Sequence, residues 1–330
     1  MRDAAEDSAG TPFEVACDES GSEGEHLIGA NTDVFAHGSV HLALDEAAAS
    51  VQEVRDRVRS PATEYKANHL LREKQRAVLE WILGPDGPLL GQAHVHLTDK
   101  TAYVVDRLVL VMTGEEAPAT CATLLQAGPA LGDRWQRLLH TGNDLLRSRS
   151  LSAAPMPVDA FFTALDEIAR SADLDGAADA FAALGSGRER AETYRSDVAP
   201  GPPVVPLLEP FFPALLRTIV YWSGRLDQPV AVVHDETNTL TPERVEHLRR
   251  LAGPALASFD RVDSTHDARV QLADFLAGVA RKLGSDALGG RADRSLVELL
   301  RPYVDPASVW GDPVSGAQFG LPAPEIAARG

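Results

Sequence analysis

The chain has 330 residues, of which 44% are hydrophobic and 24% charged, a composition typical of globular proteins that excludes wholesale disorder. Its 48 acidic and 31 basic residues leave a formal net charge of −17, which argues against a protein that binds nucleic acid through clustered Lys and Arg. This charge is still compatible with a nuclease, because bound metal ions supply positive charge locally.

The cysteine content and the N-terminal residues indicate the cellular setting. Cys17 and Cys121 are too few for a disulfide framework or a Cys-based zinc site, so we expect a reducing, cytoplasmic environment. Residues 1–12 are acidic and small, which predicts a disordered arm rather than a secretory signal. The sequence contains no run of about 18 apolar residues, so neither a transmembrane helix nor a membrane partner is expected. Scarce lysine beside abundant Ala, Arg and Asp is typical of a bacterial protein with a GC-rich gene.

The N-terminal part of the chain is expected to contain strands and helices in alternation. Apolar and polar side chains alternate over residues 13–18, the pattern of a strand with one buried face. A turn-rich stretch follows, and a second extended segment is expected over residues 33–44. Apolar residues at helical spacing predict helices over residues 45–58 and 67–83, and residues 92–98 predict a short strand.

The middle of the chain is predicted to be helical. Helical periodicity runs from Tyr103 to about Val198, and six prolines over residues 200–213 then predict a linker or hinge. The phenylalanines of this block are expected to form its core rather than a base-stacking surface: Phe161, Phe162 and Phe181.

The C-terminal part returns to alternating strands and helices. A helix is expected at about 214–225, and the continuous β-branched run over residues 229–235 predicts a strand buried on both faces. Thr241 and Pro242 predict the start of a helix, as cap and first residue. The elements expected after it are a strand over 258–264, a helix over 267–283 and a short helix near 294–301.

This order of elements predicts the fold class and the domains. We expect an α/β core of residues 13–99 and 229–285, discontinuous in sequence because a large helical insertion over residues 100–228 interrupts it. Residues 286–330 are then a C-terminal extension.

Three acidic residues occupy positions that packing does not require. Asp18 and Asp235 end expected strands, and ligands of α/β sheets bind at strand ends. Asp274 lies in an apolar helix, where it shares one face with Gln271 and Gly278. A carboxylate there is costly to bury unless it is paired or bound to a metal. Asp is also a common turn residue, so the combination, rather than any single Asp, indicates a site.

The motifs around these acids occur in a characteristic order. Asp18-Glu19-Ser20-Gly21 follows an apolar strand, and then come Glu64-Tyr65-Lys66, the strand ending in Asp235, and Gln271-Leu272-Ala273-Asp274. Together they resemble the DUF3800 family. The resemblance covers residues 13–99 and 229–283, and it implies an RNase H-like fold: a mixed β-sheet flanked by helices, with acidic residues at strand and helix ends.

The resemblance also implies the residues of a site. Carried over to this sequence, the catalytic and metal-binding carboxylates are Asp18, Glu64, Asp235 and Asp274. Converging carboxylates repel one another, and two Mg²⁺ or Mn²⁺ ions about 4 Å apart would neutralise them, activate a water and stabilise the leaving oxygen of a phosphodiester. The residues expected to contact substrate are Ser20, Lys66 and Gln271. His266 is either a proton shuttle or an exposed loop histidine.

We therefore expect a divalent-metal-dependent phosphodiester hydrolase, most simply a nuclease, with nucleic acid or a nucleotide as substrate. Two alternatives stay open. The first is a non-catalytic RNase H-like interaction module with a protein partner at residues 100–228. The second is a phosphohydrolase of small nucleotides, which needs no long basic groove.

Other chemistries have weaker support in the sequence. His94 and His96 face the same way on the expected strand, as in His-x-His zinc sites, but no further histidine cluster accompanies them. Cys17 has no nearby His or helix start to activate it, which favours a buried core residue. P-loop, dinucleotide-binding and serine-hydrolase motifs do not occur.

Overall fold

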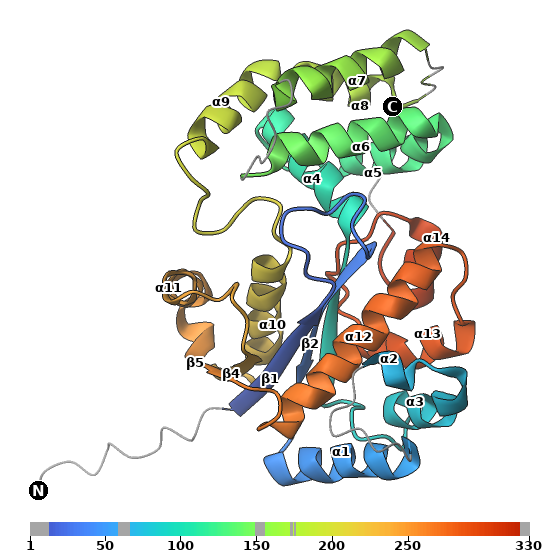
Figure 1. Ribbon diagram of the computed structural model, residues 1–330, viewed down its shortest axis with the longest axis vertical. Coiled ribbons are helices and arrows are strands. Elements are labelled where there is room, and N and C mark those ends of the chain that lie inside the picture. Colours follow the sequence, from blue (N-terminus) through green and yellow to red (C-terminus); the bar gives the residue numbers. More distant parts are fainter. Residues whose placement is uncertain (1–12, 59–66, 149–155, 172–173, 175, 324–330) are drawn as a thin grey trace, which may run out of the picture. The chain divides into compact units, whose positions relative to one another are not determined.

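The computed structural model (Figure 1) describes residues 13–58, 67–148, 156–171, 174 and 176–323, so the predicted arm over residues 1–12 lies outside it. One mixed sheet of five strands is present in these segments, in the order β3-β2-β1-β4-β5. Its strands are β1 (Phe13–Ser20), β2 (Val34–Val40), β3 (Ala93–Asp99), β4 (Val230–Asp235) and β5 (Leu256–Val262). β4 pairs in parallel with both β1 and β5. The predicted α/β class is confirmed.

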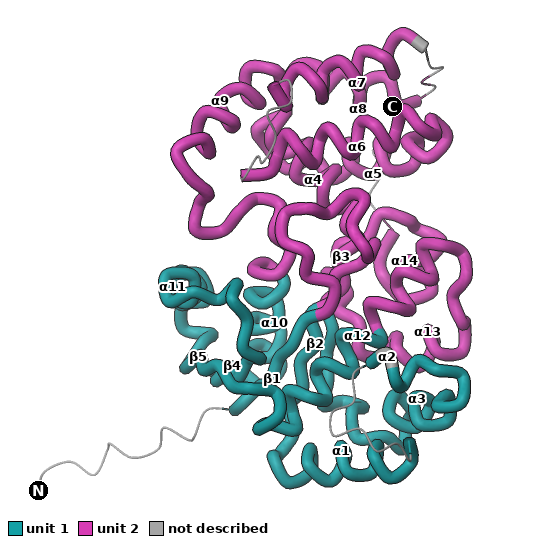
Figure 2. The backbone as a smooth tube through the Cα atoms, viewed as in Figure 1, with its two compact units in different colours: residues 1–19, 37–95, 214–279 teal, residues 20–36, 96–213, 280–330 magenta. Residues whose placement is uncertain are grey.

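The chain forms two compact units (Figure 2). The described residues within 1–19, 37–95 and 214–279 make the first unit, and those within 20–36, 96–213 and 280–330 make the second. The loop after β1 and the C-terminal segment therefore group with the helical block, which the sequence pattern does not indicate.

The first unit contains helices from both the N-terminal and the C-terminal parts of the chain. Its helices are α1 (Leu44–Val58), α2 (Ala67–Leu70), α3 (Arg76–Leu83), most of α10 (Phe211–Leu226), α11 (Pro242–Ala252) and the first part of α12 (Ala268–Leu288). As predicted, Thr241 caps α11: its Oγ1 accepts a hydrogen bond from the backbone N–H of Arg244.

One predicted helix of this unit is wrong. A continuous helix over residues 67–83 was expected, but α2 and α3 are separate because Arg72 is extended, with φ −73° and ψ 139°. Gln75, buried at the start of α3, donates its side-chain amide to the carbonyl of Val58 at 3.2 Å. This contact joins the start of α3 to the end of α1.

The second unit has a core of its own. Its helices are α4 (Lys100–Thr113), α5 (Pro118–Ala127), α6 (Asp133–Leu146), α7 (Pro157–Ser171), α8 (Ala178–Gly185), α9 (Arg188–Val198), α13 (Arg294–Leu300) and α14 (Pro313–Phe319). Phe161, Phe162 and Phe181 are buried in this core, as expected. α14 was not predicted from the sequence. None of the helices in the described segments combines the length and apolar character needed to cross a bilayer.

The helical block also holds the loop that follows β1. The side-chain oxygen of Asn143 accepts the backbone N–H groups of Leu27 and Ile28 at 2.9 and 3.0 Å. The buried amine of Lys100 donates to Glu23 and to the hydroxyl of Thr32. These contacts explain why residues 20–36 belong to the second unit.

One face of β2 is polar and packs against α10. His37 and Ser39 are fully buried on this face, two positions apart as the strand period requires. The His37 ring contacts the Thr218 hydroxyl at 2.9 Å, and the Trp222 indole N–H donates to the Ser39 hydroxyl at 2.8 Å. Buried polar groups are costly unless they are paired, so these contacts select the packing of α10 on this face.

The opposite face of β2 is in close contact with α12. A Cβ atom at Gly38 would lie 2.6 Å from the carbonyl oxygen of Ala273 and 3.2 Å from the Cβ of Ala277. Only a glycine on the strand and small residues on the helix permit this approach. The contact therefore sets the position of α12, and of Asp274 next to Ala273, relative to the strands.

The close approach predicts the effect of a single methyl group. Gly38→Ala is expected to lower the free energy of unfolding by about 1–3 kcal/mol, because the new methyl overlaps the backbone of α12. Urea unfolding measures the change. Gly224→Ala is the matched control: its Cβ meets no atom within 4 Å and it lies in helix α10, so it is expected to stabilise the protein by about 0.5–1 kcal/mol. A neutral or stabilising Gly38→Ala would contradict this account.

Candidate active site

Two of the predicted carboxylates lie on neighbouring parallel strands: Asp235 is the last residue of β4, and Asp18 lies two residues before the end of β1. Ala16 of β1 is in register with Val233 of β4, and the following residues are in register up to Cys17 and His234, so Asp18 and Asp235 come next on their strands. Neighbouring strands are about 4.8 Å apart. Alternation places both carboxylates on the face where Ala16 and Val233 pack against Val270 of α12.

The third predicted carboxylate comes from the helix on that face. Asp274 of α12 raises the pKa of Asp18 through its charge, as does Asp235. The pKa of Asp18 is raised to about 9, first by burial, then by the charge of Glu19, then by Asp274 and Asp235. The structure therefore places Asp18 within reach of the charges of both Asp235 and Asp274.

Glu19 is a fourth carboxylate of this cluster that the sequence analysis did not single out. Its pKa is raised to about 7, first by burial and then by the charge of Asp235, with a smaller effect of Asp274. Its Oε2 atom is buried, lies 3.7 Å from Nε2 of His234 and has no hydrogen-bond partner among the described residues. Because Glu19 follows Asp18 on the strand, its side chain starts from the opposite face of the sheet. The Asp18-Glu19-Ser20-Gly21 motif itself was the signal that could have indicated it.

Two buried histidines on the α10 face were also missed. His234 and His37 are fully buried, and their Nε2 atoms are 3.3 Å apart. Burial lowers the pKa of His234 to about 4, so its ring is neutral at pH 7. In the sequence, the one signal was that each histidine stands at a strand position whose side chain points into the core. Apolar residues occupy such positions more often.

Backbone contacts hold the Asp235 carboxylate. Its Oδ1 accepts the backbone N–H of Ser264 at 3.0 Å, and the side-chain amide of Gln271 donates to the carbonyl of Ser264 at 2.9 Å. Gln271, expected to contact substrate, is thus engaged with the loop that holds Asp235. The Oδ1 atom of Asp18 accepts the backbone N–H of Glu19 at 2.7 Å.

The remaining predicted residues are Glu64, Lys66, Ser20 and His266. Glu64 and Lys66 lie outside the described residues. The hydroxyl of Ser20 accepts a hydrogen bond from Nε of Arg281 at 2.9 Å, within the second unit. His266 is exposed on the loop after β5.

The two histidines of β3 have separate surroundings. The ring of His94 stacks on Tyr221 with centroids 3.7 Å apart, whereas Nδ1 of His96 lies 3.3 Å from a carboxylate oxygen of Asp305. Cys17 is fully buried and its thiol pKa is raised, first by burial, so it is an inert core residue, as expected.

The donor chemistry of the cluster fits a hard cation, but its geometry does not form a ready cage. Asp18, Glu19, Asp235 and Asp274 supply carboxylate oxygens, the ligands that Mg²⁺ and Mn²⁺ prefer. Burial and mutual repulsion disfavour the ionised forms of Asp18 and Glu19, and a divalent cation relieves both effects. Within the part of the chain that the structure describes, no group of three or more His, Cys, Asp or Glu side chains is arranged to hold a metal ion.

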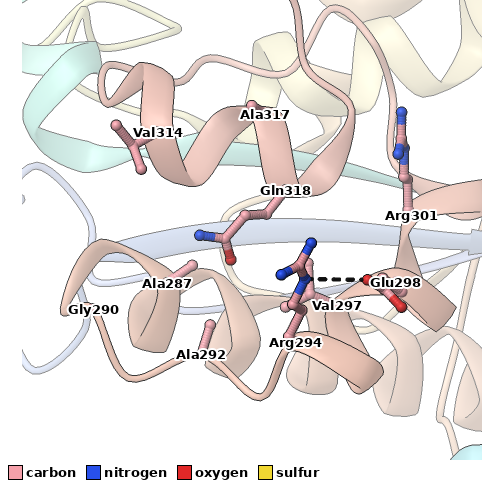
Figure 3. A pocket seen from close by; sticks show the side chains of 10 residues that line it. All are labelled: Ala287, Gly290, Ala292, Arg294, Val297, Glu298, Arg301, Val314, Ala317 and Gln318. Carbon is pink, nitrogen blue, oxygen red and sulfur yellow. Dashed lines mark hydrogen bonds and ion pairs between the residues drawn. The ribbon is translucent and has the colours of Figure 1, made fainter.

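The pocket drawn in Figure 3 is a different feature. It has a volume of about 570 Å³ and lies among the end of α12, α13 and α14. Its polar side chains are exposed, and Arg294 pairs with Glu298 at 3.3 Å. Because no buried polar group points into it, the carboxylate cluster is the stronger candidate site.

Comparisons with protein-family models, curated proteins and solved structures find no significant match for this chain. The site must therefore be interpreted from its own geometry and chemistry.

The raised pKa values predict how stability depends on pH. The protonated carboxyls of Asp18 and Glu19 contribute stability that is complete below about pH 4. It is lost as the pH rises through the folded-state pKa values, about 9 for Asp18 and about 7 for Glu19. As the pH rises between about 5 and 8, the free energy of unfolding falls by up to about 1.4 kcal/mol per pH unit for each carboxyl that stays protonated in the folded state. Urea unfolding across this range is expected to show a shallower decline for Asp18→Asn than for the wild type. The exposed Asp197→Asn serves as control and is expected to keep the wild-type slope. Equal slopes for the wild type and Asp18→Asn would refute the buried, protonated Asp18.

Proposed function

We propose that the carboxylate cluster binds divalent cations and hydrolyses phosphodiester bonds, so that the protein is a metal-dependent nuclease with an RNase H-like fold. The observation that carries the proposal is that Asp18 and Asp235 come next to each other on the paired strands β1 and β4, and that Asp18 lies within reach of the charges of Glu19, Asp235 and Asp274. A mixed sheet with α10 and α12 on opposite faces of β2, and acids at strand ends, supports the RNase H-like assignment.

The chain's own residues have distinct tasks in this proposal. Asp18, Asp235 and Asp274 hold the cations, and Mg²⁺ or Mn²⁺ bound there supplies the activation of water and the stabilisation of the leaving oxygen. Ser264 fixes the Asp235 carboxylate through its backbone N–H, and Gln271 fixes Ser264. Glu64, which the resemblance adds to this set, stays a predicted ligand.

The charge of the chain favours a limited substrate. A net charge of −17 opposes salt-dependent binding along a duplex, so a short nucleic acid or a small nucleotide is the more compatible substrate. Hydrolysis of small nucleotides is for this reason the second candidate function. The helical unit, with a hydrophobic core of its own, is the proposed place for a protein partner.

Substitution of the carboxylates tests the catalytic assignment. With Mg²⁺ or Mn²⁺ present, Asp18→Asn, Asp235→Asn and Asp274→Asn are each expected to lower kcat/KM by about 100-fold or more, because each removes a charge that holds a cation at the reacting bond. The substrates are single-stranded and double-stranded DNA, RNA, RNA–DNA hybrids and free nucleotides. Asp197→Asn, with an exposed carboxyl, is the matched control and is expected to keep wild-type activity.

Each outcome of this assay separates the candidate functions. Cleavage of nucleotides alone would replace the nuclease with a phosphohydrolase of small nucleotides. Full activity of Asp18→Asn and Asp235→Asn would show that other residues carry the reaction.

Calorimetry distinguishes an enzyme from an interaction module. Titration of the wild type with Mn²⁺ is expected to show binding in the micromolar-to-millimolar range that Asp18→Asn weakens at least about tenfold, because the cation loses a carboxylate ligand. Binding of equal strength to both proteins would place the cation elsewhere. Absence of binding at millimolar Mn²⁺, together with absence of cleavage, would favour the non-catalytic module.

A further inference from the structure

A buried chain of hydrogen bonds ends on Asp235. Thr218 of α10 contacts Nδ1 of His37 at 2.9 Å, Nε2 of His37 lies 3.3 Å from Nε2 of His234, and Nδ1 of His234 lies 2.9 Å from the backbone carbonyl oxygen of Asp235. The side chains of Thr218, His37 and His234 have no exposed surface. The chain therefore links the helix on one face of the sheet to the end of β4.

Each bond of this chain has a defined direction. A carbonyl oxygen only accepts, so Nδ1 of His234 must carry a proton. The two Nε2 atoms, 3.3 Å apart, share one proton, and with no second proton on His234 its Nε2 accepts from Nε2–H of His37. Nδ1 of His37 is left as an acceptor, and the Thr218 hydroxyl donates to it. All donors therefore point from α10 toward Asp235.

The chain meets Asp235 where the strand ends. Asp235 is the last residue of β4, and beyond it the chain leaves the strand. His234 binds its carbonyl, and Ser264 binds its carboxylate at 3.0 Å. Separate contacts therefore hold the backbone carbonyl and the carboxylate of Asp235.

We propose that His37 is a positioning residue for Asp235: by donating Nε2–H to His234, it fixes the tautomer and the ring orientation with which His234 holds the Asp235 peptide. The consequence for catalysis rests on the proposed function of Asp235. The tautomers of His37 and His234 and the position of Asp235 are independent of that function. Interactions that orient a metal ligand from outside typically change metal affinity or activity by about 10–100-fold when they are removed.

A neighbouring residue provides the matched control. Ser39 lies two residues after His37 on the same face of β2, is equally buried and accepts the indole N–H of Trp222 at 2.8 Å. Ser39→Ala removes a buried hydrogen bond without breaking the chain to Asp235. If substitution of His37 acts only by removing a buried polar group, Ser39→Ala is expected to show the same change.

Nitrogen NMR of the full-length protein at about pH 7 tests the tautomers directly. His234 is expected to be protonated at Nδ1 only and His37 at Nε2 only. A protonated Nε2 on His234 would overturn the proposal, whether or not the protein cleaves any substrate.

Amide hydrogen exchange tests the positioning without an activity assay. His37→Leu is expected to speed exchange of the Ser264 N–H by about tenfold or more, since Asp235 loses its fixed position. His37→Gln retains an amide donor near the place of Nε2–H and is expected to restore slow exchange, and Ser39→Ala is expected to leave it unchanged. Equal effects of His37→Leu and Ser39→Ala would show that His37 contributes only to packing.

Thr218→Val provides the test if His37→Leu does not fold. This variant removes only the hydroxyl donor and is expected to speed exchange of the Ser264 N–H to a smaller extent. Unchanged exchange in Thr218→Val would overturn the proposal.

If the wild type is an active hydrolase, kinetics add a third readout. His37→Leu is expected to lower kcat by about 10–100-fold with little change in KM, and His37→Gln to regain most of it. A wild type with no activity would refute the proposed function but leave the NMR and exchange results to decide the role of His37.

Discussion

Like charges that are buried side by side oppose folding unless protons or cations neutralise them, and this constraint acts at the ends of β1 and β4. Asp18 and Asp235 follow neighbouring positions of a parallel register, and Asp274 faces them from α12. Glu19 adds a fourth charge from the next position of β1. Burial and this repulsion disfavour the ionised forms of Asp18 and Glu19 and raise the pKa of both carboxyls.

The remaining packing of the first unit keeps these carboxylates together. Gly38 allows α12 to approach β2 so closely that the backbone at Ala273 touches the strand, which places the adjacent Asp274. On the other face, α10 packs over buried polar side chains rather than a purely apolar layer. The sheet is therefore covered by a tightly fitted small-residue contact on one face and by a hydrogen-bonded contact on the other. Both contacts limit how far the strand ends can move.

Much of the fold and part of the site follow from local patterns. Alternation and helical spacing predict the five strands and most helices, and the acids at the ends of two strands and in an apolar helix predict Asp18, Asp235 and Asp274. The break between α2 and α3 was not predictable, because it depends on the contact of Gln75 with Val58. Glu19, His37 and His234 were missed for the same reason: their importance depends on partners from distant parts of the chain.

The sequence by itself determined the α/β class and singled out three carboxylates, because these depend on periodicity and on residue type. The parallel pairing that sets Asp18 beside Asp235 came only from the tertiary structure. Only the tertiary structure decided which groups neutralise or orient them. His37 contacts His234, which lies 197 positions away in the chain, and the backbone N–H of Ser264 holds the carboxylate of Asp235. Such contacts arise when packing excludes water from both partners, and no local pattern encodes which partner is met.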